Sequence, residues 1–112
     1  MATSTTLFPQ TPENLVRDQA GNVYKMYCGS KVLTPGSAET SVRVFTTAEQ
    51  QSEFGRAFDV ARDQFFCANT DFSANPSEVV PVVESTAMWA RECSNTIIAN
   101  PIRISYMVLI RQ

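Results

Sequence analysis

Residues 102–111 read IRISYMVLIR, and this stretch decides which fold the chain can adopt. Its even-numbered positions are apolar or aromatic: Ile102, Ile104, Tyr106, Val108 and Ile110. Alternate side chains of a β-strand point to opposite faces, so the even-numbered residues form one continuous apolar face. Arg103 and Arg111 then lie on the reverse face. We therefore expect a long strand that packs its apolar face on a core.

Three upstream segments also favour extended structure. Leu15–Asp18 and Val23–Cys28 flank the turn residues 19–22 (QAGN), which predicts a β-hairpin. Residues 34–37 (TPGS) have the proline and glycine of a type II turn. Ser41–Thr46 (SVRVFT) then alternates in the manner of a half-buried strand.

The hydrophobic period changes after this strand. Phe54, Phe58 and Phe65, with Ala61 between the last two, recur at helical spacing. A Thr followed three residues later by Glu or Gln, at Thr46 or the next position, is typical of a capping box. These features predict a helix over residues 48–68.

A second helix is expected over residues 82–98. Pro81 is suited to open it, and the apolar face of the segment includes Trp89. An Asn-Pro pair at positions 100 and 101 would stop it. The alternative is a short strand at Val79–Glu84 with a shorter helix behind it.

These elements predict an α+β fold of the order β-β-β-α-α-β. In this arrangement, two helices pack on one face of a mostly antiparallel sheet of about four strands. A chain of 112 residues has room for one domain, residues 1–112. Residues 1–12 carry two prolines and little periodicity, so they are expected to form an extended arm.

Charge and cysteine usage bear on the compartment. The net charge of −2 divides into basic ends, expected to form strands, and an acidic middle, expected to be helical. Cys28, Cys67 and Cys93 form no paired motif, and we expect each to be a small buried hydrophobe. With no signal peptide or membrane span recognised, we expect a cytoplasmic protein, or one in a particle such as a virion.

Several chemistries are excluded by composition. The chain has no histidine, and its four glycines form no phosphate-binding loop. We therefore expect no catalytic site, metal or cofactor. The acidic pairs Asp59 with Asp63 and Glu49 with Glu53 are expected to be solvated helix faces, and Glu84 and Glu92 surface residues.

The predicted sheet offers a candidate contact surface. Its arginine-bearing face could contact nucleic-acid phosphates and stack bases on aromatic rings, or it could face solvent or another protein. The candidate residues are Lys25, Tyr27, Arg43, Phe45, Arg103 and Arg111.

The composition favours a non-enzymatic, self-associating structural protein. An example is a small coat or shell subunit of a virus or phage, whose basic sheet face contacts RNA or DNA. The low charged fraction of 18% and a long strand able to pair across a two-fold axis favour a homo-oligomer. The alternative is an adaptor that presents the sheet face or the Trp89 helix to another protein. A carboxylate enzyme using Asp59, Asp63 and Glu84 is the least favoured reading.

Overall fold

The computed structural model describes residues 15–34, 41–71, 78–85, 87–93 and 101–112. Within these ranges the chain forms one helix, α1 (Thr47–Phe54), and a series of strands. The strands are β2 (Leu15–Arg17), β3 (Val23–Leu33), β4 (Ser41–Thr46), β5 (Gln64–Asn69), β6 (Val79–Val83), β7 (Ala87–Glu92) and β8 (Ile102–Arg111). The predicted arm of residues 1–12 lies outside the described residues.

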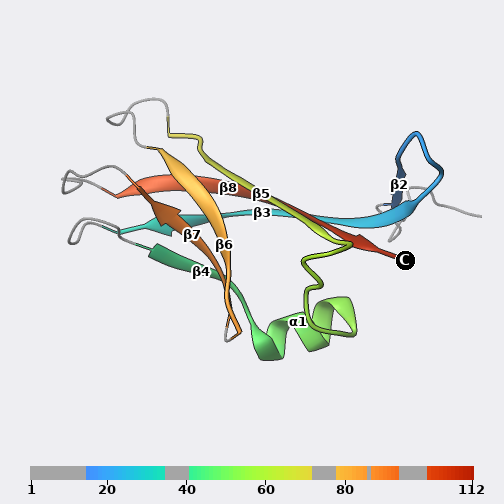
Figure 1. Cartoon of the computed structure of the whole chain (residues 1–112). Helices are drawn as coiled ribbons and strands as arrows, with labels where there is room; N and C mark the ends of the chain where they lie inside the picture. The colour runs from blue at the N-terminus through green and yellow to red at the C-terminus, as the bar shows by residue number, and fades with distance from the viewer. Residues whose placement is uncertain (1–14, 35–40, 72–77, 86, 94–100) are drawn as a thin grey trace, which may run out of the picture.

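The larger of two sheets has the strand order β2-β3-β8-β5, with every pairing antiparallel. The hairpin prediction is confirmed, since β2 and β3 pair across a turn closed by a 3.0 Å bond from Gly21 N–H to the Asp18 carbonyl. The strand at residues 102–111 is also confirmed. However, β8 lies in the middle of the sheet, between β3 and β5 (Figure 1).

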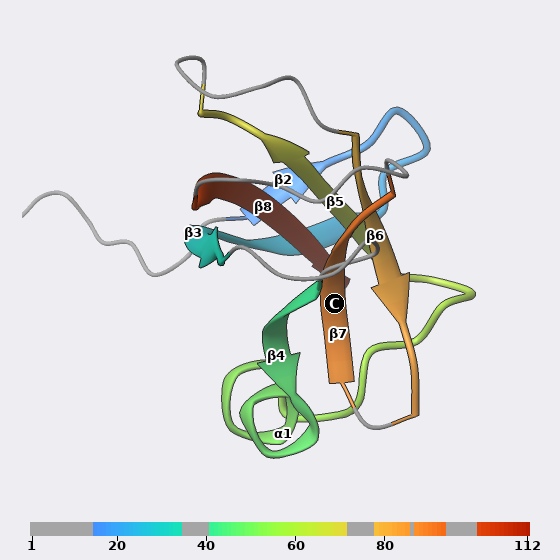
Figure 2. The ribbon, with the colours of Figure 1, turned by 90° about the vertical axis from the view of Figure 1, so that its left-hand side faces the viewer.

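The smaller sheet has the order β4-β7-β6 and lies against one face of the larger sheet (Figure 2). The core lies between them. Leu33, Ile104 and Val108 of the larger sheet are fully buried, and so are Met88 and Ala90 of the smaller one. We call the side of the larger sheet that meets this core the inner face, and its other side the outer face.

The expected α+β fold is therefore wrong. The described chain is mostly β, with two antiparallel sheets and a single short helix in place of two helices on one sheet. The acidic middle of the sequence, expected to be helical, contributes α1 but also β5, β6 and β7.

The first predicted helix, 48–68, begins correctly and ends far too early. Thr46 and Glu49 form the predicted capping box, with reciprocal bonds of 3.0 and 2.8 Å. Gly55 then adopts a φ of 79°, a left-handed conformation that glycine tolerates and that commonly ends a helix. The phenylalanines beyond it still meet, since the rings of Phe58 and Phe65 lie 6.4 Å apart.

The second predicted helix, over residues 82–98, is wrong as far as it is described. Residues 79–83 read VVPVV, and branched side chains favour extended backbone. They form β6, an edge strand, where a proline such as Pro81 is tolerated. The alternative strand at Val79–Glu84 is thus nearly correct, but the helix behind it is the strand β7. Residues 94–98 lie outside the described residues.

Candidate functional site

The six residues expected on one basic face are dispersed over the molecule. Arg103 and Arg111 lie on the outer face of the larger sheet, because they alternate with the buried residues of β8. Lys25 pairs with Ile110 and Tyr27 with Val108, which puts both on the inner face. Lys25 also lies over the Tyr27 ring, with Nζ 5.5 Å from its centroid.

The remaining two residues, in β4, are separated by a bulge. The register of β4 against β7 shifts between Arg43 and Phe45, so Val44 and Phe45 are both buried. Phe45 therefore lies in the core and not beside Arg43. Arg43 remains exposed on the far side of the smaller sheet, 5.3 Å above the Trp89 ring. No single surface contains all six residues.

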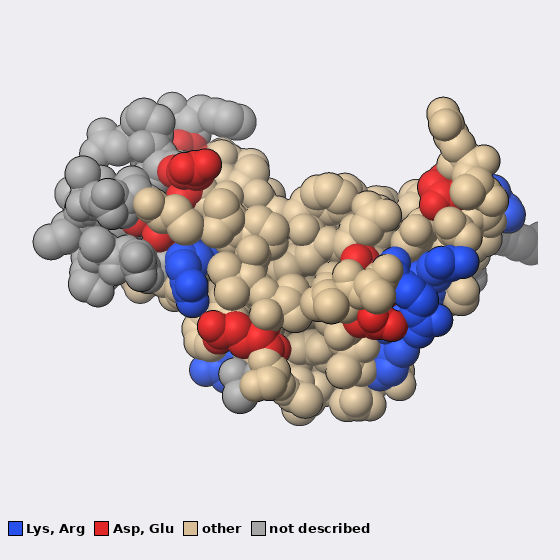
Figure 3. Space-filling view, in the orientation of Figure 1, with Lys and Arg blue, Asp and Glu red and all other residues tan. Residues whose placement is uncertain are grey.

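Between Arg103 and Arg111, the outer face of the larger sheet carries an uncharged, partly apolar surface. Phe66 on β5 is 46% exposed, and Val32 on β3, at the margin beside its strand partner Arg103, is 56% exposed. Beside Phe66 lies a shallow hollow of about 220 Å³, whose lining includes Met107 and Ser105. In the space-filling view, the upper middle of the molecule shows no charged side chain between two charged ends (Figure 3).

The edge of β5 that faces away from β8 adjoins this surface. Thr70, just beyond β5, donates its N–H to the Arg103 carbonyl, so backbone groups two and four residues earlier also face β8. The intervening residues Phe65, Cys67 and Asn69 then direct their N–H and C=O groups away from β8. Within the described chain β5 forms no ladder on that side, although β6 of the smaller sheet passes close to it.

The other described edge strands carry features that discourage further pairing. β2 has only three residues and ends at Arg17, β4 contains the bulge, and β6 contains Pro81. The sequence of β5, QFFCAN, has neither a charge nor a proline. Because the helix prediction extended over these residues, their alternation of exposed and half-buried side chains was missed.

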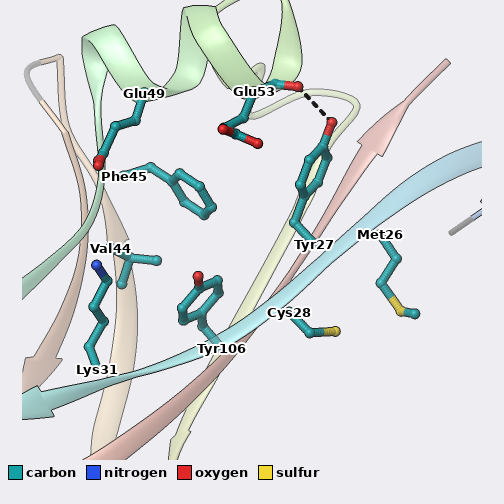
Figure 4. A pocket seen from close by; sticks show the side chains of 9 residues that line it. All are labelled: Met26, Tyr27, Cys28, Lys31, Val44, Phe45, Glu49, Glu53 and Tyr106. Atoms are coloured by element: carbon teal, nitrogen blue, oxygen red, sulfur yellow. Dashed lines mark hydrogen bonds between the residues drawn. The ribbon is translucent and has the colours of Figure 1, made fainter. Parts of the chain in front are cut away.

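A separate cavity of about 390 Å³ opens between α1 and the inner face of the larger sheet. Its walls include the aromatic rings of Tyr27, Phe45 and Tyr106, and the carboxylates of Glu49 and Glu53 on α1 (Figure 4). The helix is held over the sheet by a 2.7 Å bond from the Tyr27 hydroxyl to the Glu53 carbonyl. The remaining lining residues are Met26, Cys28, Lys31 and Val44.

Gly29 allows the ring of Tyr106 to form the floor of this cavity. The two residues are direct partners across β3 and β8, and the ring lies over the glycine. A Cβ at position 29 would come within 2.7 Å of the Tyr106 Cζ, so any side chain there would displace the ring. Burial, with the charges of Cys28, Glu49 and Glu53 adding to it, raises the pKa of Tyr106.

The two glutamates of the cavity differ in their surroundings. Glu49 accepts the Thr46 N–H of the capping box, and this bond, with the nearby charge of Lys31, lowers the pKa of Glu49. The Glu53 carboxylate points into the cavity between Tyr27 and Phe45 (Figure 4). It makes no hydrogen bond or ion pair within the described part of the chain.

The other acidic pair is structural. Asp63 has a fully buried side chain that accepts two bonds from Arg56, at 2.6 and 2.8 Å, and one from the Arg111 N–H at 2.8 Å. Burial by itself would raise the pKa of Asp63, but these bonds outweigh it and the pKa is lowered. Asp59 pairs with Arg62 at 2.9 Å. The expected solvated helix face is therefore wrong, because these residues lie in a turn.

Other sequence expectations also need correction. Cys28 and Cys93 are exposed free thiols, and Cys67 is half-buried, where desolvation raises its pKa to about 11. Glu84 is exposed, as expected, at 3.6 Å from Arg91, but Glu92 is fully buried. Trp89, placed on a helix by the sequence, lies on β7.

No group of three or more Cys, Asp or Glu side chains is arranged to hold a metal ion in the part of the chain that the structure describes. Within the same ranges, no helix is long and apolar enough to cross a membrane.

Comparison with known proteins returned no relative. No family model matches the sequence, and neither a curated protein nor a solved structure matches the chain. What the protein does must therefore be inferred from its own surfaces.

Proposed function

We propose that this chain is a non-enzymatic structural protein that self-associates by pairing the β5 strands of two copies. The observation that carries the proposal is the uncharged edge of β5 beside the exposed Phe66, an edge that forms no ladder with another strand of the described chain. Soluble monomers seldom leave such an edge open, because its unpaired N–H and C=O groups are a template for another strand.

A second copy of the chain fits this edge better than an unrelated partner. A two-fold axis perpendicular to the sheet at Phe66 would pair the two β5 strands antiparallel, which is the pairing already used throughout this sheet. The strand has no charge, so it would meet its own copy without repulsion. Phe66 of each chain would lie against Phe66 of the other, next to the shallow hollow that both chains carry.

The pairing site differs from the one that the sequence suggested. The long strand β8 was expected to pair across a two-fold axis, but both of its edges are occupied, by β3 and β5. We therefore place the pairing across the two-fold axis at β5 instead. Pairing there would join the four-stranded sheets of two chains into one continuous sheet. Further contacts between such dimers would close them into a larger shell.

The oligomeric state in solution tests the proposal. Size-exclusion chromatography with light scattering should give at least twice the 12.4 kDa mass of one chain. Phe66→Lys would set two like charges opposite each other at the axis, so we expect this variant to elute as a monomer. The matched control is Val60→Lys, because Val60 is 74% exposed but lies outside the strands.

The results separate this function from its alternatives. A wild-type monomer at every concentration would contradict self-association and favour the adaptor reading. A dimer that survives Phe66→Lys, with both variants folded by circular dichroism, would place the interface elsewhere. The ratio of absorbance at 260 and 280 nm, measured on the same peak, reports whether nucleic acid copurifies.

A further inference from the structure

We propose that the cavity between α1 and the larger sheet binds an organic ammonium group with an apolar stem. This site is separate from the β5 edge and does not depend on self-association. The volume of about 390 Å³ falls within the range of small-molecule sites.

Four rings form a connected aromatic wall in and beside the cavity. Phe54 contacts both Tyr27 and Phe45, each at a centroid distance of 4.9 Å, and Phe45 meets Tyr106 edge-on at 5.5 Å. These contacts hold Tyr27, Phe45 and Tyr106 in fixed positions around one space. Faces of aromatic rings attract cations, and several rings around one space are the common way of recognising ammonium groups.

The charge of the cavity selects a cation. The negative charge of Glu49 is offset by the nearby Lys31, and its Oε1 already accepts a hydrogen bond. The Glu53 carboxylate makes no ion pair within the described part of the chain, and it extends from α1 between the rings of Tyr27 and Phe45 (Figure 4). A ligand that places its nitrogen there would gain an ion pair with Glu53 and lie against Phe45, with the Tyr27 ring, which already has the Lys25 Nζ 5.5 Å from its centroid, at its side. Its stem would extend over Tyr106.

The mode of attachment of α1 makes the site rigid. The capping box fixes the first turn of the helix, and the Tyr27 hydroxyl holds the last turn through the Glu53 carbonyl at 2.7 Å. Gln50 is buried beneath the helix and accepts the Phe58 N–H at 2.9 Å. The two acidic side chains thus project from a helix fastened at both ends, which limits the reorganisation that binding requires.

Titration of the full chain with n-butylammonium tests the proposal, followed by NMR of the tyrosine ring signals and by calorimetry. We expect saturable binding with a dissociation constant on the order of 1 mM, as suits an exposed cation–aromatic site. 1-Butanol and butyrate are the neutral and anionic controls, and both should bind at least about fivefold more weakly.

Variants with opposite expected effects identify the residues. Glu53→Gln should weaken n-butylammonium binding by about three- to tenfold, because it removes the ion pair. Lys31→Gln should strengthen it by about two- to threefold, because it removes a competing cation from the wall. The matched control is Glu78→Gln, an exposed glutamate outside the cavity, which should leave binding unchanged.

Several results would overturn the proposal. One is the absence of saturation up to about 100 mM, two orders above the expected constant. Equal binding of 1-butanol, or weaker binding in Lys31→Gln, would each show that the cavity does not select a cation. A lysine-containing peptide and the free amine, compared in the same titration, distinguish a protein side chain from a small amine as the source of the ammonium group.

Discussion

At the scale of single residues, the buried carboxylate of Asp63 connects two distant parts of the chain. Arg56 binds both carboxylate oxygens and also donates to the Arg111 carbonyl at 3.0 Å, while the Arg111 N–H returns a bond to Asp63. The segment after α1 is thereby tied to the last residues of β8. Removal of one partner from such a pair leaves an uncompensated charge or donor in a site that excludes water.

Asp63→Asn should therefore lower the free energy of unfolding by about 2–4 kcal/mol, allowing for the partial exposure of Arg56. Urea denaturation followed by circular dichroism measures this loss. Asp59→Asn is the control: its carboxylate is partly exposed and pairs with Arg62 in a surface ion pair, so the loss should be much smaller than that of Asp63→Asn. Equal losses in the two variants would contradict a special role for Asp63.

The same carboxylate makes stability depend on pH. Its pKa is lower in the folded chain than in the unfolded one, so the unfolded state binds the proton more readily. Its contribution is complete above the unfolded value of about 3.9 and is lost as the pH falls through the lower folded value. The wild type should thus lose more stability than Asp63→Asn between about pH 5 and pH 2.

At the scale of elements, strands were predicted well wherever side chains alternate strictly. Ile102–Arg111 and Ser41–Thr46 were found from this pattern, although a bulge interrupts the alternation of Ser41–Thr46 in the structure, and the hairpin at the start was found from its turn residues. The helix beginning at Thr47 was found from its capping box. Each of these signals is local, so no knowledge of the partner strands was needed.

The errors arose where a helical spacing of apolar residues occurred by coincidence. Phe58 and Phe65 meet in space and Phe54 packs against the same core, but the three belong to a loop, a strand and a helix. Gly55 was the local signal that could have separated them. In the VVPVV segment, the preference of branched residues for extended backbone was given less weight than a helical face. Neither of the two proposed sites, the β5 edge and the cavity, could be predicted from the sequence, because both depend on which strands are neighbours and in what register.

The capping box of α1 gives a prediction at this scale. Thr46→Ala removes the acceptor for the Glu49 N–H and should destabilise the protein by about 1 kcal/mol. Hydrogen exchange should show faster opening of the first helical turn than of the sheets. Ser52→Ala removes a hydroxyl from the exposed side of the same helix and should cost nothing measurable. If both variants open the helix equally, the cap is not what holds it.

At the scale of the whole molecule, the three cysteines report how copies associate. Cys28 lies on the outer face two strands away from the β5 edge, and Cys93 is exposed at the end of β7. Edge pairing would leave both accessible, whereas stacking of two outer faces would cover Cys28. The reactive species is the thiolate, and the raised pKa of Cys67, about 11, keeps that fraction small.

We therefore expect alkylation at pH 8 to modify Cys28 and Cys93 rapidly and Cys67 at least about tenfold more slowly. Mass spectrometry of digested samples at timed intervals gives the three rates. Phe66→Lys should leave the rate at Cys28 unchanged. If that substitution instead accelerates Cys28, the copies associate through their outer faces, and the edge-pairing geometry is incorrect.

The central position of β8 also constrains when the larger sheet can form during synthesis. β3 and β5 emerge from the ribosome first, but each uses β8 as a neighbour, and β8 is the last described strand to be translated. Until it appears, the nascent chain holds two strands that lack their shared centre, and Asp63 lacks the Arg111 N–H. Closing such distant pairs is slow, so the larger sheet should form only after β8 has been synthesised.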